Sequence, residues 1–231
     1  MRDKIAIVTG ASGNLGQAMV KKFLNEGYKV IGTVIPGDPI KIDVDSPGFE
    51  AEVVNLIDED NSLQFIESVI KKHGGIDAAV LTVGGFAMGT IAETNTTDIL
   101  KQYKLNFETA YNVARPSFIQ MLKQGSGRIF MIGSRPGLNA KDGKGMVAYG
   151  LGKSLLFRLA DLMNDEAKGH NVVTSVVIPS TIDTPQNRKG MPDADPSGWV
   201  KAEAIADIIY FYCTREASAL REPVLKIYNK A

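Results

Sequence analysis

Tyr149 and Lys153 are the residues of this sequence whose types and spacing most directly suggest proton transfer. They stand four positions apart in the segment AYGLGKSLLFRLADLM, whose leucines recur at helical spacing, so both fall on one face of a predicted helix over 147–168. A phenol with a reference pKa of about 10 needs help to exchange a proton near neutral pH, and a neighbouring ammonium can stabilise its phenolate. The pair could act as a general acid, although the spacing alone is also typical of a solvated surface pair.

Two glycines interrupt the same predicted helix. Gly150 and Gly152 lie on either side of Leu151, and each costs about 1 kcal/mol relative to alanine inside a helix. With Tyr149 and Lys153 directed at a ligand, these glycines would face elsewhere and leave room for a close neighbour. We expect that neighbour to be either the adjacent helix or a second subunit.

Ser134 places a third polar group near this helix. It follows the apolar segment GRIFMIG, which predicts a strand, so its hydroxyl falls at the C-terminal end of that strand. Open α/β sheets bind their ligands at that edge. The sequence therefore brings Ser134 to the side of the sheet where chemistry is expected.

A glycine-rich turn, TGASGNLG, follows the first predicted strand and precedes a predicted helix over 14–26. Gly10 allows a tight turn, Gly13 allows the backbone to approach a ligand, and Gly16 permits close packing of the helix on the strand. The N–H groups at the start of the helix would face a pyrophosphate. This placement favours dinucleotide binding over glycines retained for packing alone. We expect the cofactor site to include Gly10, Ser12, Gly13, Asn14 and Leu15 of this turn, and Val34 at the end of the second predicted strand.

The usual determinant of NAD specificity is missing. An acid at the end of the second strand commonly holds the adenosine ribose, but that end falls here at Val34 and Ile35. No arginine replaces the acid, and Asp38 and Lys41 in the following loop would have opposite effects. We expect NAD(P), with a slight preference for NADP because Val34 replaces the acid.

The order of elements predicts an α/β fold. Short apolar strands alternate with amphipathic helices, as expected for a Rossmann-like, doubly wound parallel sheet of about seven strands with helices on both faces. Proline and glycine between 35 and 48 leave no room for a full helix, and 179–199 reads as a long polar loop. The predicted strands are 4–9, 28–34, 51–57, 76–83, 127–133, 171–179 and 223–229, and the predicted helices are 14–26, 61–73, 97–123, 147–168 and 201–214.

Length, composition and net charge limit the kinds of partner that this protein is expected to bind. The chain has 231 residues, 44% of them hydrophobic, which suits one domain over 1–231. Lys plus Arg and Asp plus Glu both number 26, so no net charge attracts nucleic acid or an anionic membrane. We expect a small-molecule substrate and no nucleic-acid or membrane partner.

The cysteine and histidine counts and the first residues of the sequence bear on metal binding and on the cellular compartment. Cys213 is the one cysteine and only two histidines accompany it, which argues against a metal or Cys/His catalytic site, so no metal is expected. The start MRDKIAIVTG enters a strand pattern at once, and no apolar run approaches a membrane span. We expect a cytoplasmic protein without a signal peptide.

These motifs together resemble the short-chain dehydrogenase/reductase family over the whole chain. The resemblance rests on TGASGNLG, Ser134, Tyr149-x-x-x-Lys153, the segment PSTIDT, and Asn106 in KLNFETA. It implies hydride transfer between a nicotinamide and a carbonyl or imine, with Tyr149 as proton donor. It also implies that Asn55, Gly84, Lys153 and Thr184 belong to the cofactor site. It further implies that Lys153 lowers the pKa of Tyr149 and holds the nicotinamide ribose, that Ser134 polarises the substrate oxygen, and that Asn106 holds a water or backbone link behind Lys153.

Within the family, three stretches are similar to quinonoid dihydropteridine reductases: IPSTIDTPQNRKGMPDADPSGW, VGGFAMG and GMVAYGLGKSLL. Phe86 stands where those enzymes often have tryptophan, and it would keep an aromatic wall for a flat heterocycle. The chain departs from them at Val34, where they carry the ribose-binding aspartate, and at Ser134, which they typically lack. We expect the substrate pocket to include Phe86, Ser134, Tyr149 and Met191.

Three functions stay open at this point. The first is an NAD(P)H-dependent reductase of a dihydropterin or similar planar compound, and the second is a general carbonyl or 3-oxoacyl reductase, which Ser134 favours. The third is a dinucleotide-binding sensor without turnover, because a fold does not dictate function. By the family resemblance we expect a homodimer or homotetramer.

Overall fold

A seven-stranded parallel sheet forms the centre of the computed structural model, which describes residues 2–37 and 46–230. Its strand order is β3-β2-β1-β4-β5-β6-β9, and two-residue strands β7 and β8 pair separately. The strands are β1 Ile5–Thr9, β2 Lys29–Val34, β3 Phe49–Val53, β4 Ala78–Leu81, β5 Ser126–Ile132, β6 Asn171–Pro179, β7 Ile182–Asp183, β8 Val200–Lys201 and β9 Val224–Ile227.

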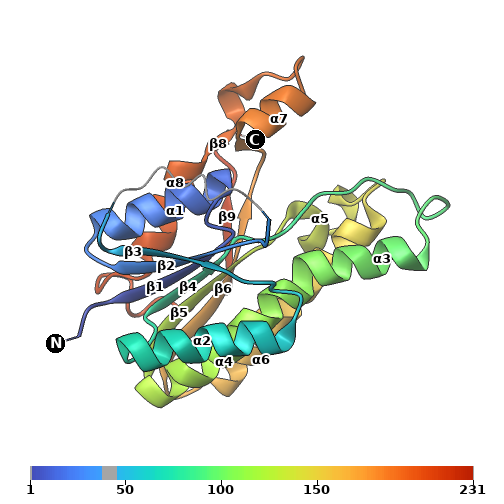
Figure 1. Ribbon diagram of the computed structural model, residues 1–231. Coiled ribbons are helices and arrows are strands. Elements are labelled where there is room, and N and C mark those ends of the chain that lie inside the picture. The colour runs from blue at the N-terminus through green and yellow to red at the C-terminus, as the bar shows by residue number, and fades with distance from the viewer. Residues whose placement is uncertain (1, 38–45, 231) are drawn as a thin grey trace.

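Helices cover both faces of this sheet, as Figure 1 shows. One face carries α2, α4 and α6, and the other carries α1 and α8. The helices are α1 Asn14–Asn25, α2 Glu59–His73, α3 Thr96–Tyr103, α4 Thr109–Gln124, α5 Arg135–Leu138, α6 Val147–Glu166, α7 Pro185–Gly190 and α8 Ala202–Phe211, with a π turn at Lys104–Glu108 and 3-10 turns at Ala140–Asp142 and Pro196–Gly198.

The central strands are apolar because both of their faces are covered. All five residues of β1 and all four residues of β4 are buried, as expected for strands inside a parallel sheet. Successive side chains enter opposite cores, so Ile7 belongs to the core that α2, α4 and α6 cover while Val8 belongs to the core that α1 and α8 cover. The predicted fold class is therefore confirmed.

The strand order reverses between β1 and β4, which are neighbours in the sheet although β2 and β3 separate them in the chain. Such a point leaves a crevice at the carboxyl ends of the two strands, where doubly wound sheets bind ligands. The glycine-rich turn leaves β1 at this point, and the segment that contains Gly84 leaves β4 beside it.

Three predicted elements differ from the structure. The strand predicted at 51–57 is β3 at Phe49–Val53, which begins and ends earlier in the chain and forms a half-exposed edge of the sheet. The helix predicted over 97–123 contains a π turn at Lys104–Glu108, which hydrophobic spacing does not reveal. The polar loop 179–199 contains β7 and the short helix α7. Among the described residues, no helix is long and apolar enough to cross a membrane.

Candidate active site

Ser134 and Tyr149 meet at the carboxyl edge of the sheet. Ser134 directly follows β5 and Gly133, and its Oγ accepts a hydrogen bond from the N–H of Gly137 at 3.2 Å, so it caps the short helix α5. The Tyr149 side chain is hydrogen-bonded to that of Ser134, and the ring of Phe86 lies edge-on at 5.2 Å between centroids. Three of the four predicted pocket residues therefore lie together.

Burial raises the pKa of the Tyr149 phenol, and Ser134 is the group that opposes this shift. The predicted effect of Lys153 on the Tyr149 pKa stays a prediction. The Lys153 Nζ donates a hydrogen bond to the backbone carbonyl of Ile132 at 2.7 Å. Burial also lowers the pKa of Lys153 to about 8, because a buried ammonium loses hydration.

Asn106 is fully buried inside the π turn between α3 and α4. Its Oδ1 accepts from the N–H of Gly85 and its Nδ2 donates to the carbonyl of Gly85, both at 3.0 Å. The same Nδ2 donates to Oε1 of Gln102 at 2.8 Å. The structure thus shows a backbone link, one of the two contacts predicted for Asn106, and it runs to the segment after β4. π turns are frequent at functional sites.

The two glycines of α6 face neighbouring segments of the same chain. A Cβ on Gly152 would lie 2.9 Å from the backbone carbonyl oxygen of Gln102 in α3, and one on Gly150 would lie 3.3 Å from that of Pro136. Of the two neighbours that the sequence left open, the structure selects the adjacent segments of the chain itself. The missing side chains let the helix that carries Tyr149 and Lys153 pack closely on α3 and α5.

The glycine-rich turn after β1 is tightly folded. Gly10 has a φ of +63°, a left-handed backbone conformation that residues other than glycine rarely adopt. A Cβ on Gly16 would lie 2.1 Å from the carbonyl oxygen of Gly10, so the start of α1 can approach the turn only with glycine there. Side chains of Asp58 and Asn95 cap α2 and α3, whereas α1 begins with no side-chain cap and no acid in its first turn. Its first N–H groups stay available to an anion.

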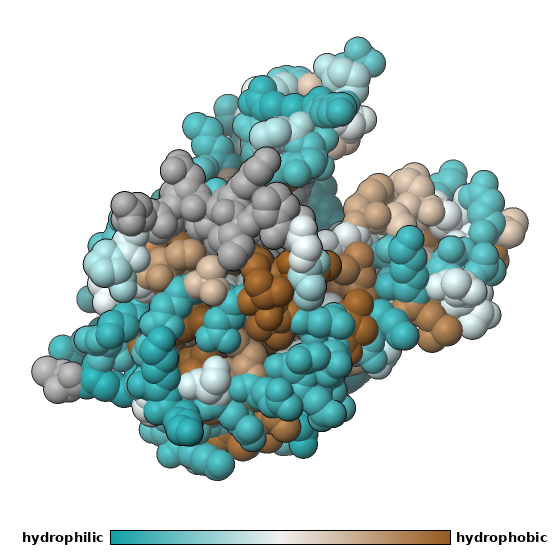
Figure 2. Space-filling model, viewed as in Figure 1, coloured by the Kyte–Doolittle hydropathy of each residue, from teal (hydrophilic) through white to brown (hydrophobic). Residues whose placement is uncertain are grey.

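A cavity of about 410 Å³ opens beside this turn, at the switch point between β1 and β4. Figure 2 shows hydrophobic residues gathered in the hollowed middle of this face. The cavity is lined by nine of the ten residues that we predicted for the cofactor: Gly10, Ser12, Gly13, Asn14, Leu15, Val34, Asn55, Gly84 and Thr184. Lys153, the tenth, lies just beyond it, because a Cβ on Gly84 would be 2.9 Å from its Nζ.

Among the described residues, none that lines this cavity carries a charge. Val34 is buried, with 1% of its surface exposed, whereas Ile35 beside it is 62% exposed. The cavity wall at the end of β2 thus presents neither a carboxylate for a ribose nor a cation for a phosphate. Asp38 and Lys41 lie outside the described residues.

The loop after β6 lines the cavity with Thr184 and contacts the glycine-rich turn through Gln186. Thr184 caps α7 by accepting from the N–H of Asn187 at 3.1 Å. Gln186 accepts a hydrogen bond from Asn14 at 2.6 Å and so ties α7 to the glycine-rich turn. Met191, the fourth predicted pocket residue, ends α7 with an exposed side chain. None of the four predicted pocket residues, Phe86, Ser134, Tyr149 and Met191, is among those that line this cavity.

Sequence reasoning missed two polar residues of the site, Gln186 and Gln102. The four-residue spacing of Gln102 and Asn106 was a signal for the second, but Gln186 offered none because its partner Asn14 is far away in sequence. It also missed several residues that line the cavity: Thr33, Ile35, Val54, Leu56, Ile57, Thr82, Val83, Leu105 and Thr109. Among the described residues, no group of three or more His, Cys, Asp or Glu side chains could hold a metal ion.

This fold and site define a dinucleotide-dependent oxidoreductase, and comparison with known proteins gives the family. The model of the family described as short chain dehydrogenase matches residues 4–195. The chain belongs to the short-chain dehydrogenase/reductase family and is an NAD(P)-dependent oxidoreductase.

The chain is similar to proteins with several different names and activities. The chain is 27% identical over 245 residues to the 3-oxoacyl-[acyl-carrier-protein] reductase of Thermotoga maritima, covering 98% of this chain and 97% of that protein. It is 29% identical over 189 residues to the acetoacetyl-CoA reductase of an Acinetobacter species, covering 79% and 75%. The solved structure of ElxO with NADP bound shares the fold, with a TM-score of 0.88 and 22% identity over 98% of this chain and 97% of that one.

Proposed function

We propose that this protein reduces a polarised carbonyl or imine with NAD(P)H, and that Tyr149 donates the proton. The observation that carries the proposal is the contact between Ser134 and Tyr149, together with Lys153 Nζ next to Gly84, which lines the cavity built on the glycine-rich turn. Ser134 would hold the substrate oxygen next to the Tyr149 hydroxyl. Negative charge develops on that oxygen during reduction, and fixed donors stabilise it there.

The residues present fit a nicotinamide dinucleotide. The uncapped start of α1 with Gly13 and Asn14 would bind the pyrophosphate, and Lys153 would hold the nicotinamide ribose. The bound cofactor supplies the hydride. Thr184 and Gly84 would border the nicotinamide end, while Val34, Ile35 and Asn55 would border the adenosine end. With no charged group among the described lining residues, a strong preference for NAD or NADP is not expected.

The first substrate class that we propose is a dihydropterin or a similar planar heterocycle. Support comes from the sequence similarity of the 178–199 segment to dihydropteridine reductases and from the aromatic edge of Phe86 next to Tyr149. An aromatic side chain offers a flat ring both area and favourable stacking geometry. Met191 would join this pocket when the loop that carries α7 closes over a ligand.

The second substrate class is a 3-oxoacyl thioester or another simple ketone. Two relatives carry names of that chemistry, 3-oxoacyl-[acyl-carrier-protein] reductase and acetoacetyl-CoA reductase. Ser134 favours this class, because the dihydropteridine reductases that the chain resembles typically lack the serine. Discrimination between the two classes calls for a substrate panel.

The test is oxidation of NADH and NADPH by the purified protein, followed at the nicotinamide absorbance. One arm contains freshly generated quinonoid dihydropterin, and another contains acetoacetyl-CoA. Turnover only in the first arm supports the dihydropterin class, and turnover only in the second supports the acyl class. Cofactor binding without turnover in either arm, repeated over a wider ketone panel, would overturn the reductase proposal in favour of a sensor.

Assembly and location are further parts of this proposal. We propose a cytoplasmic homodimer or homotetramer in which exposed leucines of α6 contribute to the contact. Leu151, Leu155 and Leu162 lie near one face of that helix and are all exposed in the monomer. Exposed apolar residues that share a face are typical of contacts between subunits.

A further inference from the structure

Two side-chain amides fasten the two ends of β4 to one long helical segment, which runs from α3 through the π turn into α4. At the carboxyl end of β4, Asn106 bonds both backbone groups of Gly85. At the amino end, Gln124 does the same to Ile76, accepting from its N–H at 2.9 Å and donating to its carbonyl at 2.8 Å. Each arrangement is here called an amide clamp.

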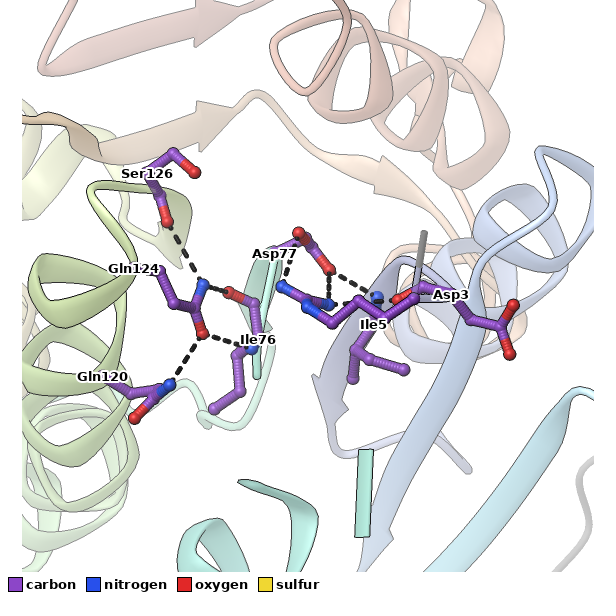
Figure 3. Close-up of polar contacts among 8 residues, drawn as sticks. Asp3, Ile5, Ile76, Asp77, Gln120, Gln124 and Ser126 are labelled. Carbon is purple, nitrogen blue, oxygen red and sulfur yellow. Dashed lines mark hydrogen bonds and ion pairs between the residues drawn. The ribbon is translucent and has the colours of Figure 1, made fainter. Parts of the chain in front are cut away.

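The clamps share two further features. Each clamping amide is bonded by a second amide four residues earlier: Gln102 accepts from Asn106 at 2.8 Å, and Gln120 donates to Gln124 at 3.0 Å. Figure 3 shows the second clamp, with Gln120, Gln124 and Ile76 in one chain of hydrogen bonds. In each clamp, a glycine directly precedes the residue whose backbone is bonded: Gly84 precedes Gly85, and Gly75 precedes Ile76. A Cβ on Gly84 would lie 2.7 Å from the amide oxygen of Asn106, and one on Gly75 would lie 2.4 Å from that of Gln124.

Donor and acceptor requirements fix the orientation of the amides at the carboxyl end. The N–H of Gly85 can only donate, so Asn106 must present its oxygen there and its Nδ2 to the Gly85 carbonyl. The second hydrogen of that Nδ2 then needs an acceptor, which Oε1 of Gln102 provides. Since Asn106 is fully buried and Gln102 is nearly so, loss of the acceptor would leave a buried donor unpaired.

The clamp of Asn106 differs from that of Gln124 in its surroundings. Gly84 lines the cavity beside the glycine-rich turn, and its Cα lies close to Nζ of Lys153. The backbone carbonyl of Gln102 also contacts Gly152 of the helix that carries Tyr149 and Lys153. Gln102 therefore contacts α6 directly and the Gly84–Gly85 segment through Asn106, and these two segments must stay in register for hydride and proton transfer. Gln120 and Gln124 have the same kind of bond at the opposite end of β4.

We propose that Gln102 is a positioning residue, which holds Asn106 in the orientation that fixes the Gly84–Gly85 segment against Lys153 and the cofactor. This inference rests on the proposed reductase function for its effects on turnover. Its effects on hydrogen exchange do not depend on that function. Misplacement of reacting groups by about 1 Å can cost up to about 100-fold in rate, so a loosened clamp is expected to be visible in kcat.

The experiment compares Gln102→Met with Gln120→Met, which removes the corresponding amide from the other clamp. Methionine keeps the length of glutamine but replaces the amide oxygen that accepts from Asn106 with a methyl group and a weakly accepting sulfur. In the protein without cofactor, hydrogen exchange should accelerate in residues 83–86 for Gln102→Met and in residues 75–77 for Gln120→Met. For Gln102→Met we expect kcat to fall about tenfold, the primary isotope effect with 4-deuterated NAD(P)H to rise, and the cofactor Kd to rise severalfold. Gln120→Met should leave all three at parental values.

Two results would overturn the proposal. One is unchanged exchange in residues 83–86 of Gln102→Met, and the other is faster exchange there with kcat, isotope effect and cofactor Kd unaltered, which would make Gln102 purely structural. If the parent protein shows no turnover, the reductase function fails by itself. The exchange rates and cofactor Kd of the two variants then still decide whether Gln102 positions the site.

Discussion

The Nζ of Lys153 donates a hydrogen bond to the carbonyl oxygen of Ile132 at 2.7 Å, and its side chain is buried near the carboxyl edge of the sheet. This single neutral acceptor replaces the hydration shell of an ammonium only in part. The cost of burying the charge lowers the pKa of Lys153 from 10.5 to about 8. Stability should therefore depend on pH.

The unfolded chain binds the Lys153 proton up to a higher pH than the folded one does. Between pH 8 and 10.5 the unfolded state thus carries more protons, and stability rises with pH across that window. We expect the free energy of unfolding of the parent, relative to Lys153→Met, to increase from pH 7 to pH 10. Urea titrations of both proteins at several pH values measure this difference. A difference independent of pH would show that the Lys153 pKa is not lowered.

Replacement of Tyr149 by phenylalanine removes the proposed proton donor and keeps the ring against Phe86. We expect kcat to fall by about 100-fold or more, with the NAD(P)H Kd from fluorescence unchanged. Tyr111→Phe, on the exposed side of α4, is the matched control and should retain parental kcat. Parental turnover in Tyr149→Phe would remove Tyr149 from the mechanism.

Cofactor preference should respond to a charge at position 35, where the side chain is exposed at the end of β2. Ile35→Asp would add a ribose acceptor and shift the ratio of kcat/KM for NADH over NADPH upward by about tenfold, the size of one charged hydrogen bond. Ile35→Arg would pair with a 2′-phosphate and shift the ratio the other way. If both variants shift the ratio in the same direction, position 35 does not face the adenosine ribose.

At Gly152, replacement by alanine should destabilise the protein, although Gly→Ala inside a helix usually stabilises it. Gly→Ala inside a helix normally stabilises by about 0.4–1 kcal/mol, but here the new Cβ would meet a backbone carbonyl at 2.9 Å. We expect Gly152→Ala to lower Tm, and Gly152→Leu to lower it further. Gly150→Ala, with 3.3 Å to its nearest neighbour, should lower Tm less or raise it. A stabilised Gly152→Ala would contradict the close packing of α6 on α3.

Oligomer formation can be tested on α6 without touching the site. Leu155 is 38% exposed on that helix, and Leu220 is 39% exposed near the C-terminal strand. We expect Leu155→Glu to lower the mass measured by light scattering, whereas Leu220→Glu leaves it unchanged. Equal masses for parent and both variants would exclude α6 as the subunit contact.

The parts of this molecule that could be predicted are those set by local pattern. The glycine-rich turn and the strand ending at Ser134 were predictable because period, glycine spacing and strand ends belong to short segments. The π turn was not, since one extra residue in a helix leaves the apolar spacing almost intact. Gln186 was hidden because its bond to Asn14 spans most of the chain. The Lys153 pKa was unpredictable because it depends on burial among segments that only the fold brings together.

The π turn also sets how many residues the long helical segment must contain. Removing one residue between 104 and 108 would restore regular α-helix and rotate everything before it by about 100° relative to α4. Gln124 could then keep its hydrogen bonds to Ile76, but the α3 portion would turn Gln102 out of its present position next to Asn106. We therefore expect a one-residue deletion between 104 and 108 to damage the protein more than single substitutions of surface residues in the same stretch. The length of the helical segment is matched to the length of β4.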